Sequence, residues 1–355
     1  MRKIICFIDD LCLGGAQRQL VGLANLLRNN EYNVRFCTYH NDGFYIDTVI
    51  ENGISYDYSE KMENNFKRIF EFIKYLKKES PDVVVSYVES PCIIACISKI
   101  LYPHFKLIVS ERNVSQKNGL TEFIRFQLFR VADHIVTNSY SQEKFINNHY
   151  EFLKSKVTTI TNFVDTSKFV SAKTIESSSI VSVGRISPQK NILNYLRAIK
   201  IIKDSGLKIH FDWYGDTDNL PYQQMCYNLI SYLDISDYIT FHPAVKNILP
   251  IYQSAFALCL PSIYEGFPNV VCEAMSCGVP ILCSDICDNP DIVTDGTNGF
   301  LFNPHDIEDI AMTIKKFCSL DYEILKKMNS NNREKALLNF SPENFFDKYR
   351  TLIEN

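Results

Sequence analysis

The sequence predicts an α/β fold with two domains, each built on a parallel β-sheet. Short apolar runs of strand length alternate with helical segments along most of the chain, which is typical of parallel sheets covered by helices on both faces. The order strand, glycine turn, helix occurs at the N-terminus and again after residue 180. The chain has 355 residues, enough for two domains of ordinary size.

Composition excludes several classes of protein. Hydrophobic residues make up 46% and charged residues 22%, values typical of a globular chain rather than a disordered one. The net charge of -4 argues against a general nucleic-acid binder. The twelve cysteines lack metal-ligand spacing and indicate free thiols in a reducing compartment. No uncharged apolar run reaches 18 residues, and the apolar start is too short for a signal peptide, so we expect a cytoplasmic protein.

The first domain begins with a buried strand at residues 4–8, a turn containing Gly14, Gly15 and Ala16, and a helix over 18–29. A simple strand-to-helix turn is one interpretation. A dinucleotide site is excluded, because the G-x-G-x-x-G pattern and its following acid are missing. Further strands are expected near 34–39, 81–86, 107–113, 132–137 and 157–160, with Ser139 or Ser141 capping the helix after the fourth of these.

Two segments of this domain, 62–78 and 120–131, combine basic and aromatic residues. In the first, an apolar stripe runs through Phe66, Phe70 and Leu76 and the remaining positions are rich in lysine and arginine. In the second, Arg125 and Arg130 flank more aromatic residues than one helical stripe can bury. Each segment is interpreted either as an ordinary surface helix or as a face that meets anionic lipid headgroups or a lipid diphosphate.

The second domain follows a polar linker at 171–179. A strand from Ile180 ends at Gly184 and Arg185, Lys190 follows, and a helix is expected over 192–204. An arginine fork and a lysine point charge commonly neutralise a diphosphate. Two solvated basic residues are the alternative. Strands are also expected at 209–214, 238–242, 254–260 and 281–284, and a last amphipathic helix over 341–353.

The most informative stretch follows the strand at 254–260. Gly266 and Pro268 shape a loop whose backbone can approach a ligand, and a helix is expected from Val270 to Ser276. Free N–H groups at the start of that helix would favour an anion. Glu265 and Glu273 bracket the loop, and carboxylates accept hydrogen bonds from vicinal hydroxyls, so the pair suggests a sugar phosphate. Either glutamate alone could be a solvated surface acid.

Glu265, seven residues and then Glu273, with Gly266, Phe267, Pro268 and Asn269 between them, resembles the Glu-x7-Glu signature of family 4 glycosyltransferases. The resemblance implies the GT-B fold, two Rossmann-like domains facing across a cleft. Residues 1–166 would form the acceptor-side domain, 167–338 the nucleotide-sugar domain, and 339–355 a helix crossing back to the first domain.

The resemblance also implies a mechanism. Arg185, Lys190 and Glu265 would be catalytic, and the transfer would retain the anomeric configuration without a metal or another cofactor. The resemblance implies a UDP-linked hexose or N-acetylhexosamine as the donor. It would contact a set of loop residues: Gly14, Gly15, Ala16, Gly184, Gly266, Phe267, Pro268, Asn269 and Glu273.

The acceptor side departs from the usual family pattern. Many members carry a histidine after the strand that ends near residue 110, whereas this chain has Ser110, Glu111, Arg112 and Asn113. That segment is similar to a subgroup acting on lipid-linked or surface-polysaccharide acceptors, so Glu111, Arg112 and Asn113 are candidates for orienting the acceptor or the sugar. The implied partners are a nucleotide-sugar donor, such an acceptor, and membrane lipid at the inner face of the cell membrane.

Two other functions remain compatible with the sequence. A nucleotide-sugar epimerase or hydrolase of the same fold would turn over a UDP-sugar without an acceptor. A non-catalytic assembly subunit would keep its function when Glu265 or Lys190 is replaced by alanine.

Overall fold

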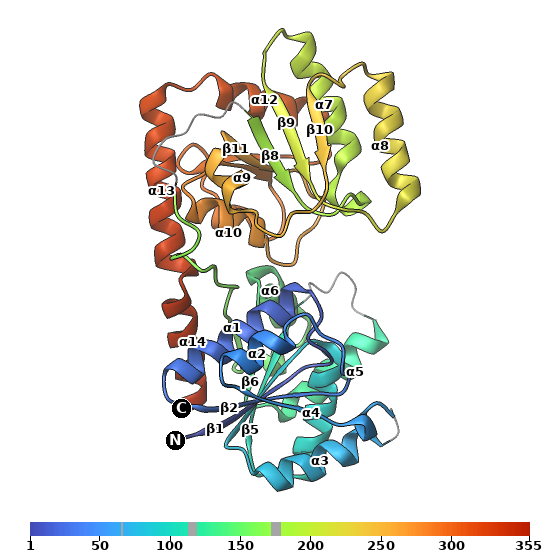
Figure 1. Cartoon of the computed structure of the whole chain (residues 1–355), viewed down its shortest axis with the longest axis vertical. Helices are drawn as coiled ribbons and strands as arrows, with labels where there is room; N and C mark the ends of the chain where they lie inside the picture. Colours follow the sequence, from blue (N-terminus) through green and yellow to red (C-terminus); the bar gives the residue numbers. More distant parts are fainter. Residues whose placement is uncertain (65–66, 113–118, 172–178) are drawn as a thin grey trace. The chain divides into compact units, whose positions relative to one another are not determined.

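The computed structural model describes residues 1–355 apart from 65–66, 113–118 and 172–178. The chain divides into two compact units (Figure 1). Unit 1 comprises Met1–Phe163 and Pro342–Asn355, and unit 2 comprises Val164–Ser341. The boundaries expected from the sequence lie three residues from these divisions (166 against 163, and 338 against 341).

Unit 1 is built on a sheet of seven parallel strands in the order β3-β2-β1-β4-β5-β6-β7. Because the sheet is parallel, the carboxyl ends of all its strands lie along one edge. The strands are β1 (Lys3–Phe7), β2 (Asn33–Thr38), β3 (Ser55–Tyr58), β4 (Val83–Tyr87), β5 (Lys106–Glu111), β6 (His134–Thr137) and β7 (Val157–Thr159).

Helices cover both faces of this sheet, and the alternation of side chains along β1 shows why. Ile4 and Cys6 join a core with α1, α2 and α14, whereas Ile5 and Phe7 join a second core with α3, α4, α5 and α6. The helices are α1 (Gly15–Asn29), α2 (Ile46–Glu51), η1 (Glu60–Met62), α3 (Arg68–Glu79), α4 (Glu89–Leu101), α5 (Leu120–Leu128), η2 (Phe129–Val131), α6 (Tyr140–His149), η3 (Glu151–Leu153) and α14 (Pro342–Glu354).

The last helix returns to unit 1, as the sequence analysis expected from resemblance. Phe345, Tyr349 and Ile353 of α14 are buried in the core that contains Ile4 and Cys6. The two termini lie close together (Figure 1), and the Arg2 guanidinium donates to the Glu354 carbonyl oxygen at 3.1 Å.

Unit 2 has a sheet of six parallel strands in the order β10-β9-β8-β11-β12-β13. The central strands β8 and β11 are neighbours, although about 75 residues separate them in the chain. The strands are β8 (Ser179–Val183), β9 (His210–Tyr214), β10 (Ile239–His242), β11 (Ala257–Leu260), β12 (Ile281–Ser284) and β13 (Gly299–Phe302).

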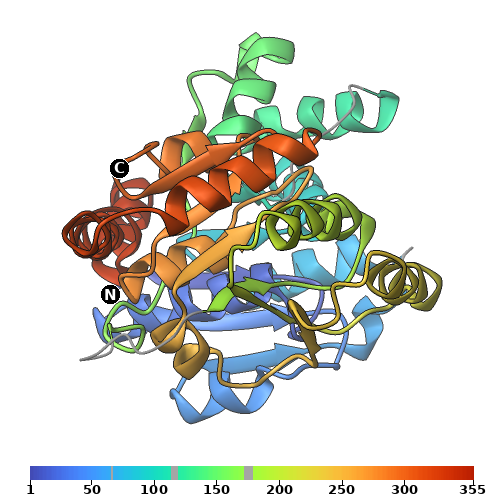
Figure 2. The same cartoon turned by 90° about the horizontal axis from the view of Figure 1, so that it is seen from above.

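The helices of unit 2 also lie on both faces of its sheet. One core joins Ile180 of β8 to α7, α8 and α12, and these three helices lie side by side in Figure 2. The other core joins Val181 of β8 to α9, α10, α11 and α13. The helices are η4 (Pro188–Lys190), α7 (Ile192–Asp204), α8 (Leu220–Tyr232), α9 (Leu249–Ser254), α10 (Asn269–Ser276), α11 (Asn289–Ile292), α12 (Ile307–Cys318) and α13 (Tyr322–Phe340).

Many predicted elements are confirmed, and α7 and β12 have the predicted bounds. Ser139 caps α6, because its hydroxyl oxygen accepts from the Gln142 N–H. β3 and most of the helices between β9 and α14 were not predicted from the sequence. Within the described part of the chain, no helix has the length and apolar character needed to cross a bilayer.

The expected basic aromatic helices need correction. The helix predicted over 62–78 begins at Arg68, and its buried stripe runs through Phe72 and Leu76, while Phe70 is exposed. Phe66 lies outside the described residues. Arg68 is buried, with its guanidinium 3.9 Å from the centre of the Tyr39 ring and its Nε donating to the Met62 carbonyl oxygen. The stripe differs at Phe70 because Phe72, and not Phe70, packs against Phe7 of β1.

The segment 120–131 forms α5 and η2, and Arg125 does not flank an exposed face. Its side chain is buried and contacts Glu111 and Glu89. Phe126 and Phe129 are buried, whereas Leu120, Phe123 and Ile124 lie on the exposed side of α5.

Candidate active site

The loop expected to bind the donor lies at the carboxyl end of β11. β11 is fully buried, the loop spans 261–268, and α10 begins at Asn269. α10 ends at a turn in which Gly278 adopts a φ of 77°, a conformation that favours glycine. The order of strand, loop and helix is as predicted; α10 begins one residue before its predicted start, and β11 begins three residues after its predicted start.

Two of the predicted catalytic side chains meet in unit 2. The Lys190 ammonium lies 2.6 Å from Oε1 of Glu265, and both side chains are largely buried. The same Oε1 accepts a hydrogen bond from the Ser262 hydroxyl. They meet because β8 and β11 are adjacent, so the loops that follow these strands share one edge of the sheet.

Backbone contacts hold the two loops together. The Ile263 N–H donates to the Gln189 carbonyl oxygen and the Gln189 side-chain amide donates to the Tyr264 carbonyl oxygen, both at 2.9 Å. Gly184 precedes Lys190 with a φ of 155°, and a Cβ placed there would stand 2.9 Å from Cε of Lys190. Glycine is therefore required at 184 both for its backbone conformation and for the path of the lysine side chain.

Glu273, the second carboxylate of the loop, is buried in α10. Its Oε2 accepts a hydrogen bond from the Tyr252 hydroxyl at 3.1 Å, and Tyr252 comes from α9. Glu265 and Glu273 thus have different partners, a cation for the first and a phenol for the second.

Arg185 lies in a different environment from Lys190. Its guanidinium is 3.2 Å from the Asp218 carboxylate, and the two side chains are 70% and 71% exposed. A pair this exposed contributes little to stability, so Arg185 can exchange Asp218 for another anion at little cost.

The loop before α10 differs from the expectation of several free amides. The N–H groups of Asn269, Val271 and Cys272 donate to the carbonyl oxygens of Phe267 and Pro268. The Phe267 ring is buried, with its centre 6.0 Å from that of Phe340. Phe267 therefore anchors the loop in the core, and its ring is not available to a ligand.

The glycine turn of unit 1 forms the start of α1. Gly14 is the N-cap in an extended conformation, and Gly15 and Ala16 are the first helical residues. No side chain caps this end, and no acid lies in the first turn. The Asp10 carboxylate fixes the turn by accepting from the Cys12 N–H and from the Gln17 side-chain amide. A helix start of this kind favours an anion.

The acceptor candidates lie at the end of β5. Glu111 is buried, its Oε1 is 3.6 Å from Nε of Arg125, and Arg125 also pairs with Glu89 at 3.0 Å. Burial raises the pKa of Glu111 to about 7, while the Arg125 charge opposes that rise. Arg112 is buried beside Tyr87, and Asn113 lies outside the described residues.

Comparison with known families adds to this geometry. Residues 13–168 match the model described as Glycosyltransferase Family 4, and residues 163–335 match the model described as Glycosyl transferases group 1. The chain belongs to the family 4, group 1 glycosyltransferases.

Individual relatives of this glycosyltransferase carry related descriptions. It is 28% identical, over 99% of its length and 98% of the relative's, to the GalNAc-alpha-(1->4)-GalNAc-alpha-(1->3)-diNAcBac-PP-undecaprenol alpha-1,4-N-acetyl-D-galactosaminyltransferase of Campylobacter jejuni. It is 28% identical, over 56% of its length and 54% of the relative's, to the UDP-Gal:alpha-D-GlcNAc-diphosphoundecaprenol alpha-1,3-galactosyltransferase of Escherichia coli.

Solved structures agree with the fold of the glycosyltransferase. A glycosyltransferase from Rickettsia africae superposes with a TM-score of 0.88 at 16% identity, covering 99% of this chain and 98% of that one. Anabaena HepE in complex with UDP superposes with a TM-score of 0.85 at 16% identity, covering both chains fully. The predicted GT-B fold is confirmed.

Sequence reasoning missed several residues around the sites of the glycosyltransferase. Ser262 and Asp218 contact the predicted catalytic side chains, and Arg125 neutralises Glu111. His242, at the end of β10, was not among the predicted site residues. Its Nε2 lies 2.7 Å from the Asp212 carboxylate and its ring stacks on Tyr214. The last contact depends on the pairing of β9 with β10, in which Tyr214 and His242 are register partners.

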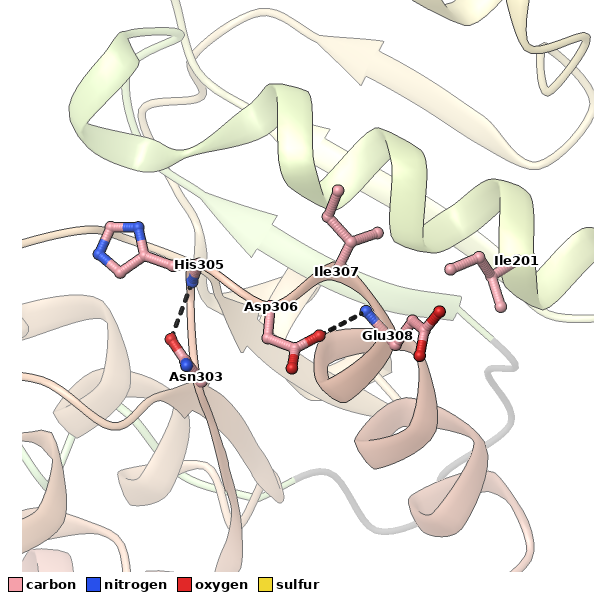
Figure 3. A pocket seen from close by; sticks show the side chains of 6 residues that line it. All are labelled: Ile201, Asn303, His305, Asp306, Ile307 and Glu308. Carbon is pink, nitrogen blue, oxygen red and sulfur yellow. Dashed lines mark hydrogen bonds between the residues drawn. The ribbon is translucent and has the colours of Figure 1, made fainter.

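A pocket of the glycosyltransferase lies away from these residues, between α7 and α12 (Figure 3). Its volume is about 620 Å³, and it is lined by Ile201, Asn303, His305, Asp306, Ile307 and Glu308. The Asp306 carboxylate caps α12 by accepting from the Glu308 and Asp309 N–H groups. None of the predicted site residues lines this pocket.

Among the described residues, no three histidine, cysteine, aspartate or glutamate side chains are grouped so as to hold a metal ion. All twelve cysteines are free: nine are buried, Cys287 and Cys318 are half-buried, and Cys12 is exposed.

Proposed function

We propose that this glycosyltransferase moves a hexose or N-acetylhexosamine from a UDP-sugar to a lipid-linked or polysaccharide acceptor in surface glycan biosynthesis, with retention of configuration. The observation that carries the proposal is the contact between Lys190 and Glu265, supported by Ser262, at the carboxyl edge of the sheet of unit 2. Ligands of open α/β sheets bind at this edge.

The chemistry follows from the donors that remain on Lys190. An ammonium has three N–H donors, and Glu265 engages one of them, so the other donors can bind phosphate oxygens. Glu265 fixes the position of the ammonium, and Ser262 fixes that of the carboxylate. Arg185, held only by an exposed ion pair, supplies a second cation. Both charges would stabilise the diphosphate as it becomes the leaving group.

The proposed step breaks the bond between the sugar C1 and the phosphate oxygen. The acceptor oxygen forms its bond to C1 on the same face of the sugar, and its proton passes to the departing phosphate oxygen. The two cations would perform the charge stabilisation that a metal supplies elsewhere, so we propose catalysis without a metal or another cofactor.

The identities of donor and acceptor are proposed from the relatives. The Escherichia coli relative is described as using UDP-Gal, and HepE was solved with UDP. The acceptors of the Campylobacter jejuni and Escherichia coli relatives are described as sugars on a diphosphate of undecaprenol. A lipid-linked sugar diphosphate is therefore the acceptor class we propose.

The decisive experiment screens nucleotide sugars for nucleotide release with and without lipid-linked acceptors. We expect release that depends on an acceptor, and an α-configured product from an α-configured donor by NMR. Lys190→Ala should lower kcat/KM. The loss should correspond to about 2–4 kcal/mol of transition-state stabilisation, as for the loss of one oxyanion donor. Lys200→Ala, which removes a lysine paired with Asp204 on α7, is the matched control.

Three results would contradict the proposal. Rapid turnover without an acceptor would favour an epimerase or hydrolase. Normal activity of Lys190→Ala would remove the assigned role. Loss of activity in EDTA, restored by a divalent cation, would contradict the metal-independent step.

We also propose peripheral contact with the inner face of the cell membrane from the cytoplasm. The support is the exposed apolar side of α5, formed by Leu120, Phe123 and Ile124, together with exposed lysines on α3. Sedimentation with vesicles containing anionic lipid tests it. Wild-type protein should bind, and Phe123→Ser/Ile124→Ser should bind less; equal binding by both would overturn the contact.

A further inference from the structure

Arg112 is a buried cation without a buried anion beside it. The residue is only 8% exposed. Its Nη2 donates to the Asn162 side-chain oxygen, and its guanidinium lies 4.6 Å from the centre of the Tyr87 ring. Among the described residues no carboxylate forms an ion pair with it, and its Nε has no hydrogen-bond partner. The neighbouring segment 113–118 contains no acidic residue.

The adjacent Glu111 does not neutralise Arg112, because successive side chains of a strand point to opposite faces. Glu111 continues the face of β5 that includes Leu107 and Val109, and it pairs there with Arg125. Arg112 continues the face of Ile108, on the side of α14. The carboxylate and the guanidinium therefore belong to different sides of the sheet.

An uncompensated buried charge is strongly unfavourable, and proteins retain one where a ligand completes it. Tyr87 offers only a ring face, and Asn162 and Ser110 offer only neutral oxygens; the Ser110 hydroxyl oxygen accepts from Nη1 of Arg112 at 3.5 Å. A second incomplete group lies next to Arg112. Asn138, after β6, donates from its side-chain amide to the Arg112 carbonyl oxygen at 3.2 Å, while its buried Oδ1 accepts no hydrogen bond.

These groups lie at the carboxyl edge of the sheet, where open α/β sheets bind their ligands. Arg112 and Asn138 follow the carboxyl ends of the adjacent strands β5 and β6. Together they offer a cationic N–H donor and an oxygen acceptor. A ligand that carries both an oxyanion and a hydroxyl group would satisfy both.

We infer that Arg112 and Asn138 form an oxyanion subsite in unit 1 that binds the phosphate of a sugar-phosphate or sugar-diphosphate acceptor, with an acceptor hydroxyl donating to Asn138. The identification of this ligand as the acceptor rests on the proposed function. The residues of this subsite belong to unit 1, whereas Lys190 belongs to unit 2.

The test measures binding rather than turnover, so it stands apart from the proposed reaction. Inorganic pyrophosphate and N-acetylglucosamine 1-phosphate are titrated calorimetrically into Lys190→Ala protein, in which the site of unit 2 is weakened. We expect both probes to bind. Adding Arg112→Gln to the Lys190→Ala protein should weaken the affinity for both anions by about 10- to 100-fold, as for the loss of a charge-assisted hydrogen bond. Arg112→Lys, which keeps the charge, should retain part of the affinity.

Further ligands and a second variant test the specificity of the subsite, and unfolding measurements test the folding of the variants. N-acetylglucosamine, which is neutral, should bind more weakly than the sugar phosphate. Glucuronic acid should also bind more weakly, and it shows whether a carboxylate can replace the phosphate. Asn138→Ala should weaken the sugar phosphate more than pyrophosphate, which has no sugar hydroxyl. Unfolding transitions of all variants are recorded to confirm that each is folded at the titration temperature.

The inference is overturned if Lys190→Ala protein binds neither anion, or if folded Arg112→Gln binds both as well as its parent. A preference for glucuronic acid over the sugar phosphate would also overturn the assignment to phosphate. If instead the anions bind through Arg112 but no transferase activity is found with any donor, the proposed reaction fails while the subsite stands.

Discussion

The contact between Gly184 and Lys190 leads to a prediction that separates activity from stability. A methyl group at 184 would lie 2.9 Å from Cε and 3.4 Å from Nζ of Lys190. Because the clash is with the flexible end of a side chain, the lysine can move aside at little cost to folding. The backbone φ of 155° adds about 1–3 kcal/mol of strain for alanine.

Gly206 provides a matched control in the same unit. Its φ is 81°, and nothing lies within 4 Å of the position that a Cβ would take. Gly206→Ala should therefore lose about 1–2 kcal/mol of stability from backbone strain alone. It should leave Lys190 in place, since Gly206 follows α7 at the end opposite to η4.

The assay compares urea unfolding with kcat/KM for the two variants. Both should lose a similar amount of stability, but only Gly184→Ala should lose about 10- to 100-fold in kcat/KM, the usual cost of displacing a catalytic group by about 1 Å. If Gly184→Ala keeps the kcat/KM of Gly206→Ala, then the position of the Lys190 ammonium does not limit the reaction and the reasoning fails.

Three further predictions concern buried groups. Because the pKa of Glu111 is raised from 4.5 to about 7, the native state holds a proton that the unfolded chain has lost, so stability should fall as the pH rises through this window, by up to about 3 kcal/mol. Glu111→Gln should flatten that dependence in denaturant titrations from pH 5 to 8, and an unchanged slope would exclude Glu111 as its source. Phe267→Ala should cost about 3–5 kcal/mol in urea unfolding because it leaves a cavity against Phe340, and a loss below about 1 kcal/mol would show that the ring is not anchored. Tyr252→Phe should raise KM for the donor more than it lowers kcat, because it loosens Glu273; a fall in kcat at constant KM would argue against a binding role for that carboxylate.

Much of the fold follows from local patterns. The bounds of α7 and β12 were predicted correctly because each is a regular apolar pattern between clear turn signals. The predicted stripe of α3 was wrong at Phe70 and correct at Leu76, since Phe70 and Phe72 are equally apolar and only the packing against Phe7 selects Phe72 for the core. Arg125 was misplaced for a similar reason, because its carboxylate partners come from other elements.

The sequence by itself determined the two α/β halves, the family, and the types of residue in the candidate site, because periodicity, glycine turns and the spacing of Glu265 and Glu273 are local properties of the chain. Only the tertiary structure decided which groups meet. The pairing of Lys190 with Glu265 depends on β8 lying beside β11, and the isolation of Arg112 from Glu111 depends on which helices cover each face of β5. Strand order and the choice of covering helix are set by packing over the whole unit, which no short stretch of sequence encodes.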